Sequence, residues 1–148
     1  MNHERTSPVE LHDLVEEHSN LRHIFEEIRL SLAERRVEQS TVAAFFIDLK
    51  EHLQLHFVHE ETGGYFAEAL AEAPRLRCRA DALLQQHPQF LEMLDHLHRF
   101  AEAGIPGESW WTQLQDAFDE FRLRFQQHEH RENELLQEAF GRDIGAED

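Results

Sequence analysis

Disulfides, membrane spans and an export signal are all missing from this sequence of 148 residues. Its one cysteine, Cys78, excludes an intrachain disulfide framework, and we interpret it as a structural thiol because no candidate base accompanies it. No stretch approaches the roughly 18 apolar residues that cross a membrane. Residues 1–7 are polar and lack the hydrophobic segment of a secretory signal. We therefore expect a cytoplasmic protein that does not enter a membrane.

Basic residues are also scarce, because 14 Lys and Arg face 30 Asp and Glu, which gives a formal net charge of −16 with histidines neutral. Three arginines lie close together, Arg75, Arg77 and Arg79, but they form no basic stripe in this acidic chain. Direct binding to nucleic acid is therefore not expected. We interpret most of the negative charge as the solvated side of amphipathic helices, and the oligomeric state is not indicated.

Hydrophobic residues make up 41% of the chain, and they recur every three or four residues over four long stretches. The predicted helices cover about residues 8–34, 41–72, 75–103 and 108–140. Pro74 and the glycines and proline of residues 104–107 are typical of breaks between helices. We find no strand alternation, and a chain of this length is expected to form one domain with one core. The sequence thus predicts a single all-α domain over residues 1–148, folded as an up-down-up-down four-helix bundle.

Each of the four apolar stripes contains one histidine, and two stripes also contain a glutamate four residues later. The stripes are Leu11, Leu14, His18, Leu21, Phe25, Ile28, Leu32; Phe46, Leu49, Leu53, His56, Glu60, Gly63, Ala67; Ala80, Leu83, His87, Phe90, Leu94, Leu97, Ala101; and Trp111, Leu114, Phe118, Phe121, Phe125, His128, Glu132, Leu135, Ala139. Ionisable groups facing a core are costly unless they are paired, hydrogen-bonded or bound to a metal. The stripes therefore predict a metal site in the bundle core. Its predicted ligands are His18, His56, Glu60, His87, His128 and Glu132.

The motif His-x-x-x-Glu is weak support by itself, because it occurs six times and such pairs are common on helix surfaces. The copies that fall off the stripes start at His12, His23, His98 and His130. We interpret these four as solvated surface pairs. Only the pairs that begin at His56 and His128 replace apolar residues in an otherwise unbroken core pattern, and this position is what indicates a metal.

The predicted ligands also lie at matching heights, since residues equally far from a turn are level in an up-down-up-down bundle. The midpoints between ligands on successive helices fall at Val37, between Ala73 and Pro74, and beside Gly107. All three midpoints coincide with predicted turns. Each His–Glu pair spans about 6 Å of helix at 1.5 Å per residue, which suits two neighbouring ions rather than one.

Pro88 directly follows one predicted ligand, His87. A proline removes a backbone donor and disfavours helix geometry in the residue before it. Two interpretations remain open: Pro88 kinks one continuous helix over residues 75–103, or it splits that helix so that a second helix begins near Pro88.

The four ligand segments together resemble the hemerythrin-like HHE cation-binding family. The segments are Glu-His18-Ser-Asn-Leu-Arg, His56-Phe-Val-His-Glu60-Glu, Leu-Leu-Gln-Gln-His87 and His128-Glu-His-Arg-Glu132. The resemblance extends over about residues 12–140 and implies a four-helix bundle around a non-haem di-iron centre that binds oxygen or other small ligands such as nitric oxide. It further implies that Glu60 and Glu132 bridge the two irons. One iron would carry His18 and His56, and the other would carry His87 and His128.

The sequence departs from the oxygen-carrying members that it resembles. Those proteins place two histidines one turn apart on the third helix, whereas Leu83 and Leu91 flank His87 here. They also place an aspartate five residues after the histidine of the fourth helix, where this chain has Asn133. The smaller ligand set leaves coordination positions for water or an added ligand. It favours redox chemistry, sensing or iron handling over reversible oxygen carriage.

Three hypotheses follow from the residues and the resemblance. The first is a protein with two Fe ions that binds or reacts with oxygen, nitric oxide or peroxide as carrier, sensor or scavenger, and that also binds azide. Zinc accepts the same ligand types and is a possible substitute for iron. The second is a di-metal redox enzyme of peroxidase or oxidase type, and the third is a metal-free helical interaction module. His59 and Glu61 flank the predicted ligands, and we interpret them as surface residues, with additional or supporting ligation as the alternative.

Overall fold

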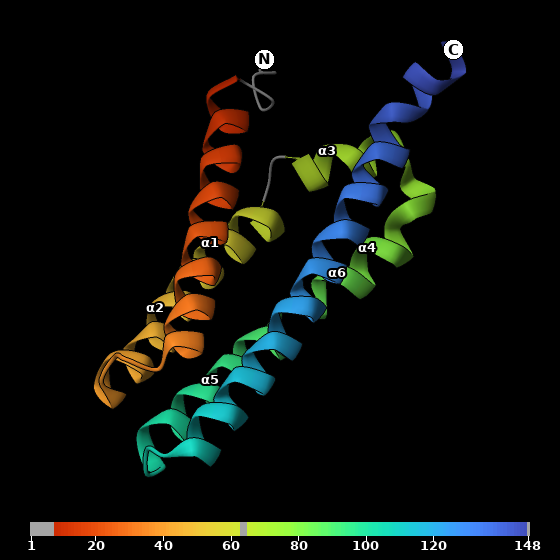
Figure 1. Ribbon diagram of the computed structural model, residues 1–148. Helices are drawn as coiled ribbons and strands as arrows, with labels where there is room; N and C mark the ends of the chain where they lie inside the picture. Colours follow the sequence, from red (N-terminus) through yellow and green to blue (C-terminus); the bar gives the residue numbers. More distant parts are fainter. Residues whose placement is uncertain (1–7, 63–64, 148) are drawn as a thin grey trace.

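The computed structural model describes the backbone of residues 8–62 and 65–147 and the side chains of residues 16–62 and 66–141. This part of the chain is helical and contains no strand, which confirms the all-α prediction (Figure 1). The elements are α1 (Pro8–Glu34), α2 (Gln39–Thr62), α3 (Tyr65–Glu72), the 3₁₀ turn η2 (Pro74–Leu76), α4 (Arg77–Leu84), α5 (His87–Ala103) and α6 (Glu108–Glu147). None of the helices described is both long and apolar enough to cross a membrane.

Two turns at the same end of the molecule connect the long helices (Figure 1). Arg35 ends α1 with a φ of 58°, the left-handed conformation that commonly terminates a helix. Gln39, at the start of α2, donates from Nε2 to the carbonyl oxygens of Ala101 at 2.7 Å and Gly104 at 2.6 Å. Gly104 is required by close packing, since a Cβ there would lie 2.6 Å from Cδ1 of Trp110. These contacts tie the turn after α1 to the turn after α5.

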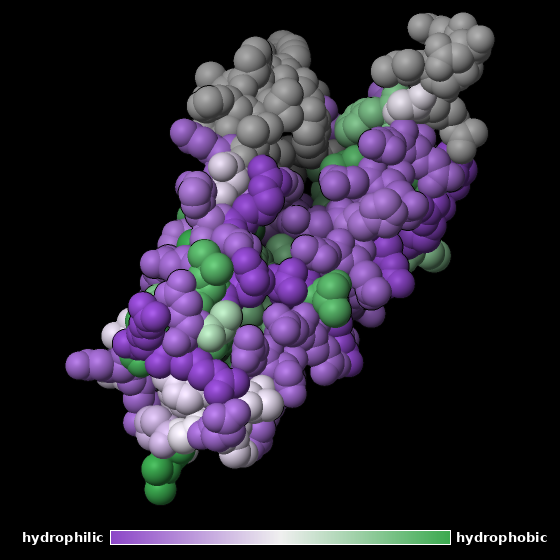
Figure 2. Space-filling model, in the orientation of Figure 1, coloured by the Kyte–Doolittle hydropathy of each residue, from purple (hydrophilic) through white to green (hydrophobic). Residues whose placement is uncertain are grey.

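The long helices contact one another in pairs: α2 lies against α1 and α5, and α6 lies against α1 and α5. In Figure 1 the chain reverses direction between α1 and α2 and again between α5 and α6. The shorter elements α3 and α4 pack on the C-terminal half of α6. The face drawn in Figure 2 is mostly hydrophilic, as expected for a chain with 30 acidic residues.

Two of the predicted helices each correspond to more than one helix of the structure. The helix predicted at 41–72 corresponds to α2 and α3, and residues 63–64 between them lie outside the described residues. The stripe predicted to continue through Gly63 to Ala67 is wrong at Ala67, which is exposed. Phe66 and Ala69 are buried in its place. The buried positions of α3 therefore do not continue the stripe extrapolated from α2.

The helix predicted at 75–103 is divided, and the split near Pro88 is the interpretation that holds. Helix α4 ends at Leu84, and α5 begins at His87 with Pro88 in its first turn. The first turn of a helix has no partner for its N–H groups, so proline costs little there. The break therefore places His87 at the beginning of a helix.

Two apolar clusters lie inside the structure. The main core contains buried residues of α1, α2, α5 and α6, and the small core contains residues of α3, η2, α4 and the later part of α6. Leu11 and Leu14 of the first predicted stripe lie outside the described side chains. At the first position of the fourth stripe, Trp111 is half-buried and packs against the main core, and its neighbour Trp110 is buried. The other predicted stripe positions of α1, α2, α4, α5 and α6 are buried, except the partly exposed His18 and Glu60.

Candidate metal centre

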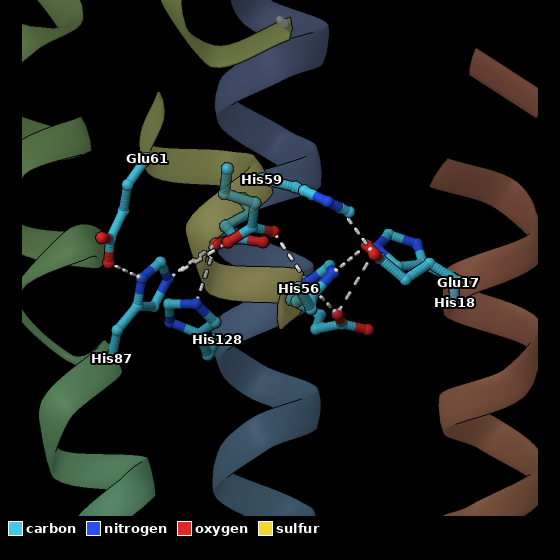
Figure 3. A network of polar contacts seen from close by, with 10 residues as sticks. Glu17, His18, His56, His59, Glu61, His87 and His128 are labelled. Atoms are coloured by element: carbon cyan, nitrogen blue, oxygen red, sulfur yellow. Dashed lines mark hydrogen bonds and ion pairs between the residues drawn. The ribbon is translucent and has the colours of Figure 1, made fainter. Parts of the chain in front are cut away.

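Seven histidine and glutamate side chains from α1, α2, α5 and α6 come together between the two apolar clusters (Figure 3). They form two groups, each of which could hold a metal ion because its donor atoms all lie within 4.8 Å of one another. The buried group consists of Glu60, His87, His128 and Glu132. The outer group consists of His18, His56 and Glu129. The structure thus brings all six predicted ligands together and adds Glu129.

The buried group is tightly enclosed. Nε2 of His128 lies 2.8 Å from Oε2 of Glu132, and Nε2 of His87 lies 3.5 Å from the same oxygen. The side chains of His87 and His128 are 2% and 1% exposed. Donors bound to one ion at about 2.1 Å lie about 3.0 to 4.2 Å apart, so these separations suit a shared ion after small adjustments.

The outer group is more open. Nε2 of His56 lies 3.6 Å from Oε2 of Glu129, and Nε2 of His18 lies 3.8 Å from the same oxygen. The side chains of His18 and Glu129 are 34% and 29% exposed, although His56 is buried. The group therefore combines one buried histidine with two residues whose side chains are partly exposed, although their donor atoms are buried.

Glu60 joins the two groups. Its Oε2 lies 2.9 Å from Nε2 of His56, and its Oε1 lies 3.1 Å from Nε2 of His87. One carboxylate oxygen thus faces each group, which is the arrangement of a bridging ligand. Glu132, for which the resemblance implied the same role, contacts His87 and His128 through Oε2.

Seven atoms in these groups have no hydrogen-bond partner within the described part of the chain. They are Nε2 of His18, His56, His87 and His128, Oε1 of Glu60, and Oε2 of Glu129 and Glu132. The short nitrogen–oxygen distances therefore bring these atoms close without giving them hydrogen-bond geometry. A buried polar atom without a partner costs about 1–3 kcal/mol. The donor set fits a metal ion, because imidazole and carboxylate donor atoms converge and a bound ion would give them the partner that they lack.

The other ring nitrogen of each buried histidine is held by a side chain outside the two groups. Nδ1 of His56 donates to Glu17 at 3.0 Å, and Nδ1 of His87 donates to Glu61 at 2.8 Å. Nδ1 of His128 donates to Oε1 of Gln86 at 2.7 Å. A proton fixed on Nδ1 leaves the Nε2 lone pair of a neutral imidazole for a metal.

His59 and Glu61 have both a surface position and a connection to the site. The Glu61 side chain is 43% exposed and contacts Nδ1 of His87. The His59 side chain is 49% exposed, and its Nδ1 lies 2.7 Å from Oε2 of Glu17. Both therefore support the donors from outside the two groups.

Mutual attraction between the ionised side chains shifts several pKa values in the metal-free protein. Burial alone would lower the pKa of His56, but the carboxylates of Glu129, Glu17 and Glu60 outweigh it and raise that pKa to about 12. Burial would also lower the pKa of His87, but the neighbouring carboxylates outweigh this effect and raise that pKa to about 9. For Glu60, burial would raise the pKa, but His56 and His87 lower it to about 2. Protons on the histidines thus balance the carboxylates when no metal does.

Aromatic rings close the side of the site that faces the main core. Phe57 stacks on the His87 ring with centroids 3.8 Å apart and planes at 6°. Phe90 lies edge-on to His128 at 5.2 Å, and Phe125 stacks on the same imidazole at 6.1 Å. Phe25, Phe90, Phe121 and Phe125 are buried in the main core. These rings separate the donors from solvent on that side.

The sequence interpretation missed Glu129, Glu17, Gln86 and Phe57. Glu17 lies four residues before Leu21, and Glu129 lies four residues after Phe125, so both flank an apolar stripe by one helical turn. This spacing of four residues from an apolar stripe was the feature of the sequence that could have indicated both glutamates. Gln86 and Phe57 sit next to predicted ligands and carried no signal of their own.

The histidines interpreted as surface residues stay away from the site where the structure describes them. His23 is exposed, and His130 pairs with Glu134 at 3.3 Å on the surface. His98 donates from Nδ1 to the carbonyl oxygen of Ala43 at 3.1 Å. His12 lies outside the described side chains.

Comparisons with known proteins add no identification: no family model, no curated protein and no solved structure matches this chain. Its function is therefore inferred from the site.

Proposed function

We propose that this chain is a hemerythrin-like protein, an up-down-up-down four-helix bundle that holds two non-haem iron ions. Its ions bind or react with oxygen, nitric oxide or peroxide, so that the protein serves as a sensor, carrier or scavenger. The observation that carries the proposal is the convergence of seven partnerless donor atoms, among the described residues, in two adjacent groups. Glu60 supports a dinuclear arrangement because its two oxygens face different groups.

The donor types favour iron among the metals that a cell offers. Imidazole suits Fe and Zn alike, and carboxylate oxygens suit harder ions, so a mixed set of four histidines with glutamates fits iron well. Zinc remains the substitute to test for. Iron, when bound, supplies reversible one-electron chemistry and open positions for small ligands. The protein supplies the ligand geometry, and the outer hydrogen bonds hold the imidazoles in place.

The enclosure of the donors supports a small ligand over a bulky substrate. Phe57, Phe90 and Phe125 cover the donors on the side of the main core. The partly exposed His18 and Glu129 provide the approach from solvent. Diatomic molecules, peroxide and small anions such as azide fit this approach.

The test is anaerobic titration of the metal-free protein with ferrous iron, followed by exposure to air. We expect two ions per chain and near-ultraviolet charge-transfer absorption from a coupled ferric pair. Azide added to the ferric protein, or nitric oxide to the ferrous protein, should shift the spectrum. Saturation at one ion per chain, or no metal uptake, contradicts the proposal, and absence of metal favours the helical interaction module.

A di-metal redox enzyme is the outcome in which the iron-loaded protein consumes peroxide catalytically with an added reductant. The control is His128→Ala, which removes a buried donor from α6. Turnover in the original protein that is lost in this variant identifies an enzyme. Stoichiometric reaction alone identifies a binding protein.

A further inference from the structure

The outer group contains a carboxylate that the six predicted ligands do not include. Glu129 lies on α6 directly after His128, which belongs to the buried group. Successive residues on a helix point about 100° apart, so neighbouring positions of α6 serve different groups. His128 is directed toward α5, where His87 lies 5.1 Å away between ring centroids. Glu129 is directed toward His18 on α1 and His56 on α2.

Hydrogen bonding to the outer histidines does not account for the position of the Glu129 carboxylate. Its Oε2 lies 3.6 Å from His56 and 3.8 Å from His18, both beyond a hydrogen bond. The oxygen is buried, although the side chain is 29% exposed, and it has no hydrogen-bond partner among the residues the structure describes. The same holds for the two imidazole nitrogens that face it. The three donor atoms thus converge without a hydrogen bond between any two of them.

The two groups would be unequal without Glu129. The buried group contains two histidines and two glutamates, whereas the outer group would contain two histidines and only the shared Glu60. Two histidines and Glu60 would give an ion in the outer group three protein ligands but only one shared negative charge, and a second carboxylate improves the charge balance. Glu129 brings the outer group to the same two-histidine, two-carboxylate composition.

We infer that Glu129 is a metal ligand of the outer group, where it binds the ion held by His18 and His56. This inference rests on the proposed di-metal centre. Its chemical consequence follows from charge: a third carboxylate adds one negative charge beside the ions, and added negative charge stabilises ferric over ferrous iron. The centre is therefore harder to reduce than one held by Glu60 and Glu132 alone.

The test compares three variants with the original protein: Glu129→Gln, Glu129→Ala and the control Glu134→Gln. Glu134 lies on the same helix, but it pairs with His130 on the surface. Because Glu129 is partly exposed, all three variants should keep the helical circular dichroism and the cooperative unfolding of the original. Each is titrated anaerobically with ferrous iron, and its reduction potential is measured.

We expect one of the two ions to bind at least about tenfold more weakly in both Glu129 variants, since loss of even a supporting partner weakens metal binding 10–100-fold. The reduction potential should rise. Added acetate should restore affinity in Glu129→Ala, because a free carboxylate can occupy the vacated position. Glu134→Gln should change none of these measurements.

The outcomes separate this inference from the proposed function. If the original protein fails to bind two ions, the proposed function fails. If it binds two ions and the Glu129 variants keep the same affinities and potential, Glu129 is not a ligand. Weaker binding without acetate rescue and without a change in potential also overturns the inference, because it indicates a structural role.

Discussion

The buried and outer groups use the same two residue types in different surroundings. Side chains of the buried group lie between the helices, next to Phe57 and Phe90, and two of its histidines are almost fully inaccessible. The outer group depends on α1, and both His18 and Glu129 reach the surface. The same residue types therefore differ in how far their side chains are exposed to solvent. We expect metal binding at the buried group to be coupled to folding, and we expect small ligands to reach the centre from the side of the outer group.

This difference arises from where the donors lie on their helices. His87 is the first residue of α5, and Pro88 in the first turn favours a helix start at this point. The imidazole of His87 is stacked on Phe57. His18 lies in the middle of α1 but has a more exposed side chain.

Removing the residue that joins the groups should have the largest effect. Glu60→Ala deletes the carboxylate that faces both His56 and His87, so both ions should be lost and the stabilisation by metal should disappear. The measurement is metal content per chain together with melting temperature before and after iron loading. The matched control is Glu51→Ala, an exposed position of α2, which should retain two ions. If Glu60→Ala still binds two ions per chain, Glu60 does not bridge them.

The two groups should respond differently to loss of a histidine. In the metal-free protein, His87→Ala leaves buried carboxylates without their partner and should cost about 3 kcal/mol of unfolding free energy. The partly exposed His18→Ala should cost less than about 1 kcal/mol. Both variants should lose metal. Urea unfolding of the metal-free proteins measures the difference, and equal destabilisation by the two changes would contradict the comparison.

The side chains that hold Nδ1 should affect one group each. Glu17→Gln weakens the support of His56, and Glu61→Gln weakens that of His87. Each change should reduce the affinity of one ion about tenfold, because it makes the imidazole a poorer donor. Anaerobic calorimetry with ferrous iron resolves the two binding steps. A control is His59→Gln, which removes only the contact to Glu17 and should have a smaller effect. If both glutamine variants weaken the same ion, the assignment of one support to each group is wrong.

Proton release on metal binding should distinguish His56 from His87. Carboxylates raise the pKa of His56 to about 12 and that of His87 to about 9, so both are protonated at pH 7 in the metal-free protein. Metal ligation requires neutral imidazole, so each of these two histidines should release one proton at pH 7. Above pH 9, His87 is already deprotonated, and its contribution should vanish while that of His56 remains. Calorimetry in buffers with different ionisation enthalpies measures the release, and a constant value from pH 7 to pH 10 would contradict the assignment. Affinity should decrease as the pH falls.

Much of the fold and of the site was accessible from the pattern of residues. The helical period placed His56 and His128 on core-facing stripes, and both are buried. It also separated them from His23 and His130, which are exposed. The pattern failed at Ala67, because the stripe extrapolated from α2 does not continue into α3. It chose Trp111 for the core, which packs there half-buried, whereas the equally apolar neighbour Trp110 is the more deeply buried of the two.

The sequence alone determined which residues face the interior, because the 3.6-residue period and the cost of burying unpaired ionisable groups act along a single helix. It thereby determined the helical class and six of the seven donors. Only the tertiary structure decided that Glu129 joins the outer group, that Glu132 lies with the buried group, and which side chains hold the other ring nitrogens. These are contacts between helices distant in sequence, and they depend on the rotation and height of each helix against its neighbours. No periodicity within one helix encodes those two quantities.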